Sequence, residues 1–124
     1  MKISLEKSIF GEKEKVFLDN GTLKAFVFKY DAGVHAVKLM NDKGYIIILP
    51  FKGQQIWEAV FGGRSLKMRS MYEDPRDVTS FRDTYGCYMM HCGALYMGCP
   101  GKGDNHPLHG ELPYADYIKA EITV

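Results

Sequence analysis

The residues best able to do chemistry gather near the end of the chain, in the segment 99–113. This segment holds His106, His109 and Glu111, which stand among three prolines and three glycines. Prolines fix φ, whereas glycines permit turns and the close approach of a ligand, so we expect these side chains in a shaped, irregular loop. The pattern predicts that the segment is a binding loop.

The elements that must position this loop belong to one small domain. The chain has 124 residues, of which 46% are hydrophobic, enough for one core and too few for two ordinary domains. Lysine and arginine total 16 against 15 acidic residues, a formal net charge of +1. Such a balance indicates neither a nucleic-acid-binding surface nor a patch for anionic membranes. We therefore expect small or neutral partners, with no nucleic acid and no membrane.

The compartment is predicted from the apolar runs and the cysteines. No run approaches the roughly 18 apolar residues of a membrane span, and the first ten residues are charged where a signal peptide needs an apolar core. Cys87, Cys92 and Cys99 are odd in number and form no CxxC pair, which favours reduced, buried thiols over a disulfide framework. A cytoplasmic location is expected.

Turn signals such as Asn20-Gly21 recur roughly every 8–12 residues and separate alternating or apolar segments, which is typical of β proteins. Strands are predicted at residues 22–30, 34–40, 45–49, 55–61, 65–70, 85–92 and 118–124. No segment has the 3.6-residue period of a helix. The sequence predicts an all-β fold, an antiparallel sandwich or barrel, in a single domain over residues 1–124.

Two segments are predicted to lie outside the strands. Residues 11–15 are charged and are expected to form a solvated turn. Residues 71–84 are rich in Asp, Glu and Arg and contain Pro75, so we predict a surface loop there. A long excursion of this kind can border a ligand site.

Three blocks of sequence, in this order and spacing, carry a resemblance to a known family. They read GYIIILPFKGQQIWEAVFGGR at residues 44–64, YGCYMMHCG at 85–93 and PLHG at 107–110. Together they resemble the N-terminal half of the galactose-mutarotase-like superfamily. The more specific similarity is to an uncharacterised bacterial branch related to the aldose 1-epimerases.

The resemblance implies an antiparallel β-sandwich, the N-terminal part of a supersandwich, with a shallow sugar cleft whose wall includes His109. Members of the family take a general-acid histidine and a general-base glutamate from their C-terminal half. The present chain is therefore expected to be a partial domain, inactive alone. It departs from the family in having Glu111 where the Leu-His-Gly-Gly segment has its second glycine, and it lacks the Asn-Arg pair that usually precedes that segment.

Mutarotation moves one proton from the anomeric hydroxyl and another to the ring oxygen, so it requires two positioned groups. Histidine, with an unperturbed pKa of about 6.5, suits one of them. His109 and Glu111 are the catalytic candidates, although a loop histidine that satisfies a neighbouring carbonyl is an equally good interpretation of His109. The candidates for substrate binding are His91, His106, His109, Arg69 and Gln55.

Several of these residues have a second interpretation. His91 either projects into the cleft or is a hydrogen-bonded core histidine, and His106 is expected at the surface. Trp57 could stack on a sugar, but a single tryptophan with apolar neighbours on its face is more often part of a core.

Three functions remain open. The first is a carbohydrate-binding protein of the aldose 1-epimerase type, which interconverts anomers only in a complete form. The second is a non-catalytic sugar-binding module, and the third is a small metal-dependent β-barrel enzyme. Histidine and cysteine ligands are present, but no metal-binding spacing organises them, so no metal or other cofactor is expected. Exposed sheet edges would favour a homo-oligomer.

Overall fold

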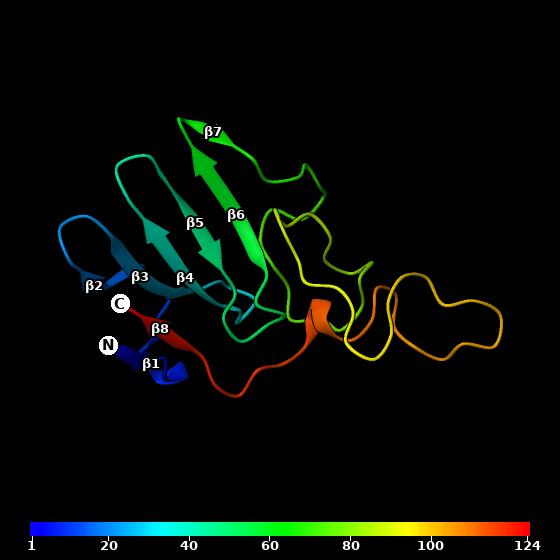
Figure 1. Ribbon diagram of the computed structural model, residues 1–124. Helices are drawn as coiled ribbons and strands as arrows, with labels where there is room; N and C mark the ends of the chain where they lie inside the picture. The colour runs from blue at the N-terminus through cyan, green and yellow to red at the C-terminus, as the bar shows by residue number, and fades with distance from the viewer.

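A computed structural model describes residues 1–124 as an all-β fold of two antiparallel sheets (Figure 1). The larger sheet has six strands in chain order: β2 (Lys15–Asp19), β3 (Lys24–Lys29), β4 (His35–Met40), β5 (Gly44–Ile48), β6 (Ile56–Phe61) and β7 (Arg64–Ser65). The smaller sheet pairs β1 (Lys2–Ser4) with β8 (Glu121–Thr123), which brings the two termini together. The prediction of an all-β, antiparallel, sandwich-like fold is confirmed.

The helical content is limited to two single turns of 3₁₀ helix. These are η1 (Lys7–Ile9) and η2 (Leu112–Tyr114). No helix of the structure has the length and apolar character needed to cross a membrane.

Local turn chemistry explains why β2 to β5 follow one another as a meander. The Asn20 side chain accepts the N–H groups of Thr22 and Leu23 between β2 and β3, at 3.1 and 2.8 Å. Asn41 does the same for Lys43 and Gly44 between β4 and β5, at 2.9 and 3.1 Å. An asparagine that replaces backbone partners in this way fixes a tight turn, and the strands on either side can then pair in register.

The larger sheet buries apolar side chains on both faces. One cluster lies on the face that β1 and β8 cover, and its members are Leu5, Phe10, Val27, Val37, Phe51 and Ala120. The second contains Val34, Ala36, Ile47, Leu49, Trp57 and Cys87. Because neighbouring strand residues such as Ala36 and Val37 point to opposite faces, the clusters lie on opposite sides of the sheet. Trp57 is only 1% exposed, which confirms its assignment to the core.

Residues 85–92 do not form the predicted strand, and that prediction is wrong. The segment touches the start of β6 through a bridge between Ile56 and Met89 and a hydrogen bond from Tyr88 to Trp57, and it then leaves the sheet. Gly86 has φ of +141°, a conformation outside the strand region. The alternating pattern of residues 85–92 reflects a partly buried loop that contributes Cys87 to the second cluster.

Several other strands differ from their predicted extent, among them β8, which covers only Glu121–Thr123 of the predicted 118–124. β2 is a strand that the sequence pattern does not predict, because the charges of residues 11–15 suggest a solvated turn up to Lys15. The strand predicted over 65–70 is confined to the two residues of β7.

The three cysteines are free, and the prediction that they are buried is wrong for Cys92 and Cys99, so the three environments predict unequal reactivity. Cys87 is buried, and burial raises the pKa of its thiol to about 11, whereas Cys92 and Cys99 are exposed. Since the thiolate is the reactive form, Cys92 and Cys99 should react with iodoacetamide in the native protein while Cys87 stays unmodified. Mass spectrometry of the labelled peptides measures this. All three should react in denaturant, and equal labelling of Cys87 in the native state would contradict the placement of this residue.

Candidate functional site

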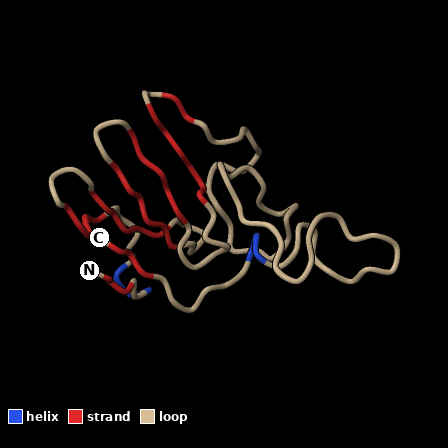
Figure 2. Tube along the Cα trace, in the orientation of Figure 1, coloured by secondary structure: helices blue, strands red, loops and turns tan.

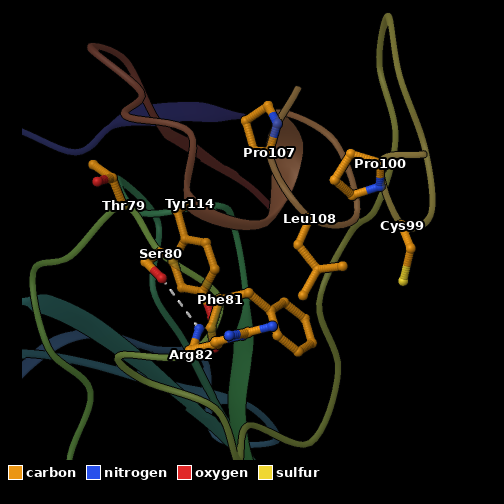
Figure 3. A pocket seen from close by; sticks show the side chains of 9 residues that line it. All are labelled: Thr79, Ser80, Phe81, Arg82, Cys99, Pro100, Pro107, Leu108 and Tyr114. Carbon is orange, nitrogen blue, oxygen red and sulfur yellow. Dashed lines mark hydrogen bonds between the residues drawn. The ribbon is translucent and has the colours of Figure 1, made fainter. Parts of the chain in front are cut away.

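A pocket of about 450 Å³ opens between loops of the chain (Figure 3). Its walls come from residues 79–82, from the 99–108 segment and from η2, none of which belongs to a sheet (Figure 2). The lining residues are Thr79, Ser80, Phe81, Arg82, Cys99, Pro100, Pro107, Leu108 and Tyr114. We call this cavity the Tyr114 pocket.

Tyr114 joins two of the loops that form the pocket. Its residue is buried, and its hydroxyl donates a hydrogen bond to the backbone oxygen of Thr84, at 2.8 Å, and lies 3.3 Å from the backbone oxygen of Phe81. Burial raises the pKa of this phenol, so the group remains protonated and able to donate. The 79–84 segment is thereby fixed against η2.

Lys52, in the turn between β5 and β6, forms ion pairs with the same two loops. Its ammonium group lies 2.8 Å from an oxygen of Asp77 and 2.6 Å from one of Asp116, and its side chain is 8% exposed. Burial alone would lower the pKa of Lys52, but its hydrogen bonds to Asp116 and Asp77 outweigh that effect and raise it. Both loops are therefore tied to the end of the β5–β6 hairpin.

Gln55 was predicted from the sequence to bind substrate, and the structure places it inside the protein. It is 1% exposed, and its Nε2 donates a hydrogen bond of 2.7 Å to the backbone oxygen of Pro113. It does not line the Tyr114 pocket. The geometry gives this side chain a positioning role, because it connects the start of β6 to η2.

His109 lies one layer behind the pocket wall. Its ring packs on the ring of Phe81 with centroids 4.5 Å apart, and Phe81 in turn lines the cavity. The backbone of His109 is left-handed, with φ of +66°, and is held by hydrogen bonds of 2.8 Å to Gly98 and from Gly93. The predicted catalytic histidine thus contacts the site through Phe81.

His106 lies in the loop that spans residues 93–110, and Glu111 lies directly after this loop and contacts it. The His106 ring stacks on Tyr96 at 4.8 Å, and its Nδ1 lies 2.9 Å from the backbone oxygen of Pro107. The Glu111 carboxylate accepts the N–H groups of Leu95 and Tyr96, at 3.1 and 3.3 Å. Glu111 therefore stabilises the shape of the loop.

The base of this 93–110 loop is a contact between two glycines. Gly93 and Gly110 form a bridge, and both have positive φ, of +99° and +84°. A Cβ atom at Gly110 would collide with the backbone oxygens of Tyr96 and Gly93. Only glycine fits at position 110.

The remaining predicted residues lie elsewhere. His91 is exposed and lines a separate apolar groove of about 410 Å³, whose other walls include Ile48, Ile56 and Ile122. Arg69 is exposed on the segment that follows β7. The structure therefore brings His106 and His109 into one loop with Glu111 at its end, and it brings neither His91 nor Arg69 to the Tyr114 pocket.

The pocket also contains residues that are not among the predicted candidates. Phe81 and Arg82 belong to the long surface loop at 71–84, and Tyr114 follows Pro113. The available signal was the length of that loop, since long excursions often border binding sites. No group of three or more histidine, cysteine, aspartate or glutamate side chains is arranged to hold a metal ion.

Comparisons of this chain with models of protein families, with curated proteins and with solved structures gave no match.

Replacing Gln55 by alanine should destabilise the protein by about 2 kcal/mol, because the buried oxygen of Pro113 loses its partner and a cavity forms. The matched control is Gln54→Ala, at an exposed neighbouring position, which should change stability by less than about 0.5 kcal/mol. Urea unfolding measures both. Equal midpoints for the two variants would show that the Gln55 hydrogen bond is unimportant.

Replacing Glu111 by alanine should loosen the 93–110 loop while leaving the sheets intact. The N–H groups of Leu95 and Tyr96 lose their acceptor, so their hydrogen exchange should accelerate about tenfold or more. Asp104→Ala is the control, since that carboxylate accepts only the Gly101 N–H at the tip of the same loop. Exchange rates at Leu95 and Tyr96 that do not change in Glu111→Ala would refute this structural role.

Proposed function

We propose that the protein binds a monosaccharide in the Tyr114 pocket, as a carbohydrate-binding protein of the aldose 1-epimerase type. One observation carries the proposal: the rings of Phe81 and Tyr114 share the cavity with the polar side chains of Thr79, Ser80 and Arg82 (Figure 3). The cavity of about 450 Å³ falls within the usual range of small-molecule sites.

The chemistry of a sugar ring matches this combination of side chains. A pyranose has a face of C–H groups that packs against aromatic rings, and a rim of hydroxyls that both donate and accept hydrogen bonds. Phe81 and Tyr114 supply the apolar surface. The hydroxyls of Thr79 and Ser80 can serve as donors or acceptors, and the guanidinium of Arg82 as a donor.

The resemblance to the galactose-mutarotase-like superfamily supports the same proposal. Its 107–110 block supplies Pro107 and Leu108 to the pocket wall and places His109 against Phe81. Its 44–64 block includes Lys52 and Gln55, which fix the loops around the cavity.

The positions of His109 and Glu111 favour binding over catalysis for this chain. Neither residue lines the pocket, and Glu111 is engaged by two backbone N–H groups. Proton transfer at a sugar requires groups within hydrogen-bond reach of the reacting atoms. We therefore propose anomer interconversion only for a protein that also carries the acid and base of the family, and a non-catalytic sugar-binding module is the second candidate.

Cys99 provides a direct test, because it lines the pocket and is exposed, whereas Cys92 is exposed outside the pocket. A bound sugar should slow iodoacetamide labelling of Cys99 and leave that of Cys92 unchanged. The panel would include glucose, galactose, mannose and their uronic acids, with saturation-transfer NMR as an independent measure of binding.

A pair of variants makes the test specific. Phe81→Ala should abolish both the protection and the saturation transfer, because it removes the aromatic wall. Tyr88→Ala changes an exposed aromatic residue that lies outside the pocket, and it should bind as the wild type does. The proposal fails if no sugar of the panel binds or if Phe81→Ala binds normally.

A further inference from the structure

Arg82 is the only charged side chain among the nine residues that line the Tyr114 pocket. The six ion pairs of the structure all use lysine as the cation, so no carboxylate neutralises this guanidinium. Asp83, the next residue in the chain, forms no ion pair with it. The pocket therefore presents one uncompensated positive charge.

The backbone of Arg82 is fixed by hydrogen bonds, although its guanidinium has no protein partner. The backbone N–H of Arg82 donates to the hydroxyl oxygen of Ser80, at 3.3 Å (Figure 3), and the backbone carbonyl accepts the hydroxyl of Tyr72, at 3.2 Å. The Asp83 N–H also donates to the backbone oxygen of Ser80, at 3.1 Å. A short turn thus presents the arginine at the cavity, with its hydrogen-bond donors available to a ligand.

On the basis of the proposed sugar site, we propose that its natural ligand is an acidic monosaccharide, a uronic acid whose carboxylate binds the Arg82 guanidinium. The planar guanidinium presents two parallel N–H donors that match the two oxygens of a carboxylate. The sugar ring would then lie against Phe81 and Tyr114, with its hydroxyls toward Thr79 and Ser80.

A carboxylate fits the pocket better than a phosphate ester. One guanidinium balances the single negative charge of a carboxylate, and the cavity holds no second cation. A phosphate monoester carries a charge of about −1.5 to −2 at neutral pH and would leave net negative charge in the site. Because Arg82 is exposed to water, the attraction is screened by salt, and the expected discrimination is moderate.

Titration calorimetry with matched ligands tests this inference. The probes are galactose, galacturonate and galactose 6-phosphate, together with glucose and glucuronate. In the wild type, each uronate should bind about tenfold more tightly than the corresponding neutral sugar. About 0.5 M NaCl should weaken uronate binding and leave the neutral sugar unaffected.

Substitutions on the 71–84 loop assign the effect to Arg82. Arg82→Gln should raise the Kd of galacturonate about tenfold and that of galactose less than about twofold. Arg76→Gln is the matched control, since that guanidinium lies 5.4 Å from the Tyr72 ring and outside the pocket, and it should change neither constant.

The outcomes separate this inference from the proposed function. Equal affinity for uronates and neutral sugars, or a uronate preference that survives Arg82→Gln, overturns the inference and leaves the sugar site standing. Tightest binding of galactose 6-phosphate also overturns it, by assigning Arg82 to a phosphate. If no probe binds, the proposed function and this inference both fail.

Discussion

The ammonium group of Lys52 lies between carboxylates from two different loops, Asp77 and Asp116, at 2.8 and 2.6 Å. A lysine that is almost fully buried needs such partners, because an unpaired charge in that position is costly. The two carboxylates are themselves 68% and 74% exposed, so the pairs contribute little net stability. Their effect is geometric: the charge of Lys52 is satisfied only when both loops meet at the end of the β5–β6 hairpin.

Two further contacts depend on that meeting of the loops. Gln55 reaches Pro113 from the start of β6, and Tyr114 reaches Phe81 and Thr84 on the neighbouring loop. Together with Lys52 they form a closed set of links among three segments that share no regular secondary structure. The pocket is therefore built on irregular backbone, yet the side formed by residues 79–84 and η2 is fastened to the end of the β5–β6 hairpin. This is a common arrangement for binding sites carried by loops.

The sheets could be predicted from the sequence because the information for them is local. Asn20 and Asn41 mark turns, and alternation identifies β3 and β4 between them. The strand prediction for residues 85–92 was wrong because alternation also arises where a loop lies half-buried on a core, as this segment does with Cys87. The site could be predicted only in part. Lys52 and Asp116 are far apart in the chain, and no periodicity of the sequence predicts their contact. His109 falls in the expected region, but its orientation toward Phe81 depends on a left-handed backbone set by tertiary contacts.

The bridge between Gly93 and Gly110 closes the base of the 93–110 loop and separates this loop from the strands of the two sheets. The segment between the two glycines contains no strand of either sheet, so its length has no bearing on strand register. Four of the pocket residues, Cys99, Pro100, Pro107 and Leu108, belong to this loop. Insertions or exchanges there would alter one wall of the cavity and leave the opposite wall, with Phe81 and Tyr114, in place.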